Sequence, residues 1–306
     1  VAQIVFWLAS PLRLSIGSPL PMAGFDFDEL DVEDQKSAPV FAGWYSGGFH
    51  KEKGEELLRL LMESVGKEFP HVDTLILHFP NEYDVEGEGT GPWPTYVDTL
   101  IHEIDKDPAR SGRPLFLFGH SRGATPAMSV AARLGARVLK LYLASSDAPV
   151  FGQPSPFQGL SERFKREGDI GLLKWFVSLD PNKMMVEICR AVESGEMKIE
   201  DTPFVNDMMK LMRKQYKDAI FPDMGKDLEG VCSPILAFRP EMDATCSRAG
   251  TERWKEWTSA WDRSRAKTVV GATHMGCLGP QQIDGQEECI MIKEILKDMA
   301  KVMAEA

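Results

Sequence analysis

The feature that most constrains the fold is the segment FLFGHSRGAT at residues 116–125. The apolar run at residues 115–118 leads directly into Gly-His-Ser-Arg-Gly, and small residues that suit a helix follow. Glycines two residues before and two residues after a serine let the backbone turn sharply, and they leave room where a strand and a helix approach each other. The segment therefore predicts a strand, a tight turn at Ser121 and a helix.

Strands and helices are expected to alternate on both sides of this turn. Apolar runs of strand length occur at residues 38–44, 71–79, 114–118, 137–145, 233–240 and 265–272. Segments that favour a helix occur at residues 53–66, 95–104, 121–135, 247–261 and 286–304. This alternation predicts an α/β protein with a mostly parallel sheet and helices on both faces.

The alternation of strands and helices stops between the fourth and fifth expected strands, and this predicts the domain organisation. Residues 150–225 favour several helices and no strand, so we expect a helical insertion in a core formed by residues 38–149 and 226–306. Residues 1–37, with the acidic stretch FDFDELDVED, are expected to be an N-terminal arm and linker. The insertion is rich in Met and aromatic residues, which suit either an ordinary core or a lid that lines an apolar channel.

A serine hydroxyl is a weak nucleophile unless a base takes its proton, and the chain supplies both a base and an acid. His274 follows the strand at residues 265–272, and Asp243 follows the strand at residues 233–240. The order Ser121, Asp243, His274 is the one expected of an α/β-hydrolase. Asp147, at the end of the fourth strand, is an alternative acid, and its other interpretation is a turn residue before Pro149.

An acyl oxyanion needs two preorganised donors. The backbone N–H of Arg122, the residue after the nucleophile, is one candidate, and that of Ser46 in GWYSGG is the other. Alternatively, Gly47 and Gly48 only form the turn between a strand and a helix. The Arg122 side chain suits either a phosphate-bearing substrate arm or a structural ion pair.

Charge and cysteine content exclude several classes of function. The net charge of -11 and pI of about 5.1 argue against nucleic acid and against anionic membrane surfaces as partners. The five cysteines contain no CxxC pair, which favours reduced thiols, a cytoplasmic location and no zinc site. The apolar stretch VAQIVFWLAS is too short to span a bilayer and lacks the basic start of a signal peptide.

With these motifs in order, the chain resembles the type II thioesterases of polyketide and nonribosomal peptide synthesis, and their relatives fused to the ends of synthases. The matching segments are YSGG at 45–48, FGHSRGA at 118–124, LYLASSDAP at 141–149, SPILAFRPEMDATCS at 233–247 and ATHMGCL at 272–278. The resemblance covers about residues 38–304. The chain departs from the family pattern in FPNEYDVEGEG after the second strand, in Arg122 where methionine is common, and in GATH before the histidine.

The resemblance implies an α/β-hydrolase fold whose helical lid is residues 150–225. It also implies hydrolysis of an acyl thioester held on the phosphopantetheine arm of an acyl carrier protein, with Ser121 as nucleophile, His274 as base and Asp243 as its orienting acid. No metal or organic cofactor is implied. Three alternatives stay open, namely a carboxylester hydrolase of free small molecules, a macrocyclising terminal domain, and a non-catalytic binding protein on the same fold. The sequence leaves the acyl group and the oligomeric state open.

Overall fold

The computed structural model describes residues 38–45, 51–78, 93–150, 156–179, 183–213, 228–283 and 285–305. The expected N-terminal arm, residues 1–37, lies outside the described residues, as do residues 81–92 of the loop expected at 81–94, whose last two residues instead begin a helix.

Six strands form one sheet in which every neighbouring pair is parallel. The order across the sheet is β2-β1-β3-β4-β5-β6. The strands are β1 (Val40–Trp44), β2 (Asp73–Leu77), β3 (Leu115–His120), β4 (Val138–Ala144), β5 (Ile235–Pro240) and β6 (Arg265–Val269). The strand order reverses direction after β2, so the chain winds first to one side of β1 and then to the other, and the predicted parallel sheet is confirmed.

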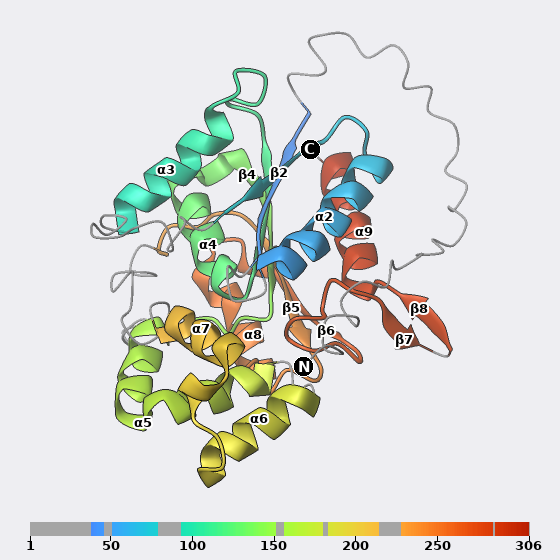
Figure 1. Cartoon of the computed structure of the whole chain (residues 1–306). Coiled ribbons are helices and arrows are strands. Elements are labelled where there is room, and N and C mark those ends of the chain that lie inside the picture. The colour runs from blue at the N-terminus through green and yellow to red at the C-terminus, as the bar shows by residue number, and fades with distance from the viewer. Residues whose placement is uncertain are drawn as a thin grey trace.

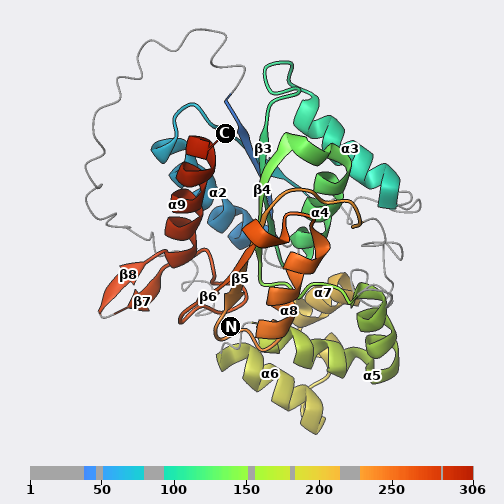
Figure 2. The ribbon, with the colours of Figure 1, turned by 180° about the vertical axis from the view of Figure 1, so that it is seen from behind.

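Helices cover both faces of the sheet (Figure 1). On one face lie α2 (Lys51–Glu68) and α9 (Ile290–Glu305), which contact each other. On the other lie α3 (Trp93–Asp105) and α4 (Ala124–Leu134), and Figure 2 shows the same two layers from behind. Each face has its own apolar core, because strands buried on both sides expose side chains alternately to the two helix layers.

The segment between β4 and β5 is mostly helical in the described part of residues 150–225. Its helices are α5 (Pro156–Leu179), α6 (Lys183–Ser194) and α7 (Pro203–Met212), and α5 bends at Gly168, whose φ is 67°. They lie together at the carboxyl end of β4 (Figures 1 and 2). A third apolar cluster, which includes Phe164, Met208 and Met209, is formed by these helices and by Ile199 of the 3₁₀ turn between α6 and α7. Among the described helices, none is long and apolar enough to cross a membrane.

The structure differs from the sequence expectations near the C-terminus. Residues 286–288 were expected to begin the last helix, but they form β8 (Gln286–Glu288), which pairs antiparallel with β7 (Gln281–Ile283). Gly285, at φ 80°, permits the tight turn between them, and the Asp-Gly dipeptide at 284–285 is the sequence signal for such a hairpin. The helix α9 starts only at Ile290.

The helix expected at residues 247–261 is broken into short pieces. It consists of α8 (Arg248–Glu252) and 3₁₀ turns at Arg253–Trp257 and Trp261–Arg263. The indole N–H groups of Trp254 and Trp257 donate to the carbonyls of Ser146 and Pro149. These bonds tie the segment to the chain after β4, and this tertiary packing overrides the local preference for a continuous helix.

Arg113 anchors the end of the sheet opposite the carboxyl ends of the strands. Its guanidinium, in a residue only 7% exposed, donates to the carbonyls of Ala38, Pro39 and His71 and pairs with Asp73 at 2.5 Å. One side chain thereby satisfies backbone groups at the start of both β1 and β2, which no apolar residue of the same size can do.

We predict that Arg113→Met lowers the free energy of unfolding by about 2–4 kcal/mol, because several buried carbonyls lose their donor. Urea denaturation measures the change. The control is Arg133→Met, since Arg133 pairs with Asp98 on the surface, where loss of the pair costs less than about 1 kcal/mol. Equal losses in the two variants would contradict the anchoring role of Arg113.

Candidate active site

The turn that carries Ser121 is strained. The strand β3 ends at His120, a single 3₁₀ turn covers Ser121–Gly123, and α4 begins at Ala124. Ser121 has φ 55°, in the left-handed region that residues other than glycine rarely adopt. Such strain costs about 1–3 kcal/mol and persists where surrounding packing enforces it, most often at functional sites.

Two glycines make the enforcing packing possible. A Cβ atom on Gly119 would lie 2.4 Å from the carbonyl oxygen of Gly123 and 2.7 Å from Cα of Ala124. A Cβ on Gly123 would lie 2.8 Å from the carbonyl oxygen of Trp44, the last residue of β1. The strand, the turn and the neighbouring strand therefore touch through backbone atoms, and only glycine fits at either position.

The sheet brings the two other predicted residues to Ser121. Strands β3, β4, β5 and β6 run parallel, so the segments that follow them emerge at one end of the sheet. Asp243 follows β5, and His274 follows β6. Nε2 of His274 lies 2.9 Å from Oγ of Ser121, and Nδ1 of His274 lies 2.7 Å from Oδ2 of Asp243.

The surroundings of Asp243 stabilise its ionised form. Its residue is 2% exposed, and its Oδ1 accepts hydrogen bonds from the backbone N–H and the hydroxyl of Thr245. Burial by itself raises the pKa of Asp243, but the hydrogen bonds and the charge interaction with His274, together with Thr245, hold this pKa below its usual value. A charged Asp243 fixes the tautomer in which Nδ1 of His274 carries the proton and Nε2 faces Ser121 as an acceptor.

Backbone hydrogen bonds join two loops at this end of the sheet. The acid loop, residues 241–247, follows β5 and carries Asp243, and the histidine loop, residues 270–280, follows β6 and carries His274. The N–H of Glu241 donates to the carbonyl of Val269, and the N–H of Met242 donates to the carbonyl of Ala272. These two bonds continue the β5–β6 pairing beyond the ends of the strands. The spacing between Asp243 and His274 is therefore set by main-chain pairing as well as by their own contact.

The alternative acid, Asp147, lies elsewhere. Its two carboxylate oxygens accept from the backbone N–H and the hydroxyl of Ser247, each at 2.9 Å. A Cβ on Gly250 would lie within 2.0 Å of the Asp147 carboxyl carbon, so α8 packs directly on this carboxylate. Asp147 thus joins the chain after β4 to the start of α8, and the structure places Asp243 beside the imidazole of His274.

The two expected oxyanion donors are only partly described. Arg122 directly follows Ser121 and precedes α4, and its residue is 5% exposed. Such burial does not suit a side chain that meets a phosphate at the surface. Ser46, with Gly47 and Gly48, lies outside the described residues.

Sequence reasoning did not assign three residues that contact the histidine loop. Tyr45, His120 and Ser145 each donate a side-chain hydrogen bond to a backbone carbonyl of that loop, at His274 or Met275. A sequence pattern records side chains, and a main-chain acceptor leaves no mark in it. The only available signal was position, because each residue lies at the end of an expected strand or within two residues after it.

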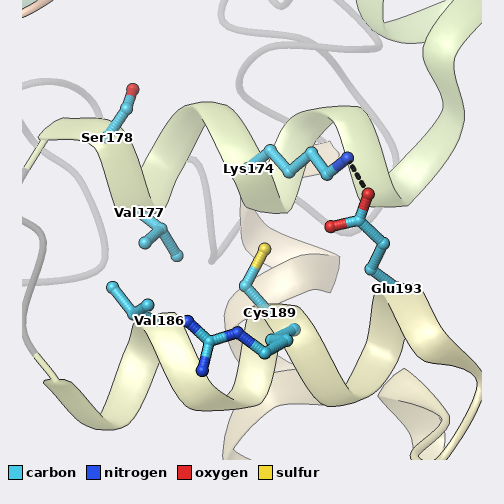
Figure 3. A pocket seen from close by; sticks show the side chains of 7 residues that line it. Lys174, Val177, Ser178, Val186, Cys189 and Glu193 are labelled. Atoms are coloured by element: carbon cyan, nitrogen blue, oxygen red, sulfur yellow. Dashed lines mark hydrogen bonds and ion pairs between the residues drawn. The ribbon is translucent and has the colours of Figure 1, made fainter.

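One hollow in the described part of the structure lies away from this site. It has a volume of about 310 Å³ and opens between α5 and α6. Figure 3 shows Cys189 between the two helices, with the Lys174–Glu193 ion pair at one end of the hollow. Neither Ser121 nor His274 lines it, so it is not the place where a substrate meets the serine.

Among the described residues we find neither a group of metal ligands nor a disulfide. They contain no group of three or more His, Cys, Asp or Glu side chains suited to hold a metal ion. All five cysteines are described and none forms a disulfide.

Comparisons with known proteins place the fold. No protein-family model matches the sequence, and no curated protein matches it significantly. Solved structures do match along nearly the whole chain. RedJ with a polyethylene glycol molecule bound in the active site is 16% identical, with 93% of this chain and 98% of that chain covered and a TM-score of 0.53.

Two other structures agree. A putative lipase from Acinetobacter baumannii is 12% identical, with 88% and 86% of the two chains covered and a TM-score of 0.53. MGS-M2, an α/β-hydrolase enzyme from a Medee basin deep-sea metagenome library, is 12% identical, with 91% and 92% covered and a TM-score of 0.50. The chain has the α/β-hydrolase fold, as the sequence predicted, and at these identities the comparisons speak to fold alone.

We predict that Gly123→Ala disrupts the turn, because the added methyl group meets main-chain atoms of Trp44 that have no room to move. The variant should lose at least about 1–3 kcal/mol of unfolding free energy. Its folded fraction should react with a fluorophosphonate at least about tenfold more slowly than the unmodified protein.

The matched control is Gly66→Ala in α2. A Cβ there meets nothing within 4 Å, so alanine should be neutral or stabilise the helix by up to about 1 kcal/mol. If Gly123→Ala behaved like Gly66→Ala in both measurements, the packing account of the turn would be wrong.

Proposed function

We propose that the protein is a serine hydrolase that cleaves acyl esters or thioesters through an acyl-serine intermediate. The observation that carries the proposal is the chain of contacts from Oγ of Ser121 through the imidazole of His274 to the buried carboxylate of Asp243, at 2.9 and 2.7 Å. Nucleophile, base and orienting acid within hydrogen-bond reach are the arrangement that acyl transfer needs. A non-catalytic binding protein has no need for a strained serine in contact with an oriented imidazole.

The reaction follows from these positions. Oγ of Ser121 attacks the acyl carbonyl carbon while Nε2 of His274 takes the hydroxyl proton. The imidazolium that forms is stabilised by Asp243, and it then returns the proton to the departing thiol or alcohol. The backbone N–H of Arg122, in the 3₁₀ turn before α4, is the donor that we assign to the oxygen of the tetrahedral intermediate, and the N-terminus of α4 adds a favourable dipole there. Water, activated by His274, cleaves the acyl-serine in the second half.

The substrate we propose is an acyl thioester on the phosphopantetheine arm of an acyl carrier protein. Support comes from three sequence segments that resemble type II thioesterases, namely the turn at Ser121, the strand end with Ala-Pro and the histidine loop. The three segments also occur in the order found in that family. The helices α5, α6 and α7, which lie at the carboxyl end of β4, are in the position for a lid over an acyl chain (Figure 1). No step requires a metal or an organic cofactor.

A second candidate is a carboxylester hydrolase of free small molecules. The putative Acinetobacter lipase shares the fold, but at 12% identity this similarity does not distinguish ester from thioester substrates. The two candidates share Ser121, Asp243 and His274, so they differ only in the leaving group and in whether a carrier protein takes part.

We predict that a fluorophosphonate labels the protein once per chain, and that Ser121→Ala abolishes the labelling. The reactive serine is the only group that the proposal places beside an oriented base. Intact-mass spectrometry measures the label. Absence of labelling in the folded wild-type protein would leave only the non-catalytic alternative.

Turnover of three substrates with one acyl group then separates the candidates. We expect kcat/KM to be highest on the acyl-carrier protein, lower on the acyl-coenzyme A and lowest on the p-nitrophenyl ester. Equal values on all three would count against a dedicated carrier partner, and a preference for the ester would favour the second candidate.

We predict different outcomes for the two carboxylates. Asp243→Asn should lower kcat by about 10³–10⁴-fold, because the amide favours the wrong tautomer of His274. Asp147→Asn should keep kcat within about threefold, which corresponds to less than about 0.7 kcal/mol in the barrier. Steady-state kinetics on the preferred substrate measures both, and the reverse ranking would give Asp147 the role proposed for Asp243.

A further inference from the structure

Three side chains from three neighbouring strands hold two consecutive carbonyls of the histidine loop. The Tyr45 hydroxyl donates to the carbonyl of Met275 at 2.6 Å. Nε2 of His120 lies 2.7 Å from the carbonyl oxygen of His274, and the Ser145 hydroxyl reaches the same oxygen at 3.2 Å. We call these three donors the carbonyl cradle.

The cradle is built into the sheet. Tyr45 directly follows β1, His120 is the last residue of β3, and Ser145 directly follows β4. These strands are adjacent in the order β1-β3-β4, so their carboxyl ends present the three donors side by side. Ser145 has φ 55°, and a serine in this uncommon conformation next to a strand end is a second strained position within the site.

His120 is the central donor, and it is fixed in place. It is fully buried, its ring stacks on Tyr45 with centroids 4.1 Å apart, and its ring meets that of His274 edge-on at 5.2 Å. Because a carbonyl can only accept, Nε2 of His120 must carry the proton of this hydrogen bond. Burial, together with the neighbouring His274, lowers the pKa of His120 to about 3, so the ring is neutral at ordinary pH.

A histidine at position 120 lowers the stability of the fold compared with an apolar side chain of similar size. Within the described part of the chain, Nδ1 of His120 is buried and has no hydrogen-bond partner. A buried polar atom without a partner destabilises the fold, and an apolar side chain of similar size would avoid that cost. The benefit that offsets it is the bond to the carbonyl of His274, the same residue whose imidazole contacts Ser121.

We propose that His120 is a positioning residue for His274. Its Nε2–H, flanked by the hydroxyls of Tyr45 and Ser145, fixes the backbone of the histidine loop so that the imidazole keeps its place between Ser121 and Asp243 while protons pass through it. The inference rests on the function proposed above, and it adds to that function a second histidine that acts by positioning the first.

The test compares two substitutions of one residue. His120→Leu fills similar volume without a donor, whereas His120→Gln places an amide N–H at the position of Nε2. With the concentration of active enzyme fixed by fluorophosphonate titration, His120→Leu should lower kcat by about 10–100-fold with KM within about twofold. His120→Gln should retain kcat within about fivefold. Arg113→Met, a destabilised variant far from the cradle, should keep kcat per titrated site unchanged.

A second measurement does not depend on turnover. Hydrogen exchange of the peptide that covers residues 270–279 should become about tenfold faster in His120→Leu and should stay near the wild-type rate in His120→Gln. If the wild-type protein turned over no substrate, the proposed function would fail, but this exchange would still decide whether His120 holds the loop.

Should His120→Leu fail to fold, Tyr45→Phe and Ser145→Ala test the same cradle, because each removes one hydroxyl with little change in size. Each should speed exchange of residues 270–279 and lower kcat by about 3–10-fold. Unchanged exchange in these variants or in a folded His120→Leu variant would overturn the proposal. Equal losses of kcat in His120→Leu and His120→Gln would overturn it too, since the lost donor would then not be the cause.

Discussion

The rest of the site depends on one tight main-chain approach, where the turn after β3 meets the end of β1. Gly119 and Gly123 let the turn pack against backbone atoms, and this packing holds Ser121 at a positive φ with its hydroxyl beside Nε2 of His274. The apolar cores on the two faces secure β1 and β3 in the middle of the sheet, so the stability of the whole domain supports one strained residue.

The parallel sheet brings the other residues of the site to the strained Ser121. Because all six strands run the same way, the loops after β5 and β6 emerge beside the serine, and their mutual hydrogen bonds set the spacing of acid and base. The same geometry places the ends of β1, β3 and β4 beneath the histidine loop. One side of that loop is thus held by side-chain donors and the other by main-chain pairing with the acid loop.

Much of this was predictable from the sequence, for physical reasons. Gly-x-Ser-x-Gly after an apolar run specifies backbone geometry directly, and strand order then leaves few places for an acid and a base, so Asp243 and His274 could be named. The cradle could not, because its acceptors are carbonyls that every residue possesses. The sequence also left Asp147 open as an acid, and only the packing of α8 against its carboxylate shows the structural contacts it makes. The β7–β8 hairpin was missed because the apolar helical pattern of the last helix was extended back to residues 286–288, which follow the Asp-Gly turn and form β8.

The central claim is that Ser121 carries the acyl group between two half-reactions. The most direct measurement is acid quenching of the protein during turnover of an acyl thioester, followed by peptide mass spectrometry. We expect the peptide that contains Ser121 to gain the mass of the acyl group in the wild-type protein, and to gain nothing in His274→Ala. Steady turnover without any acylated Ser121 peptide, and with Ser121→Ala as active as the wild type, would contradict the account.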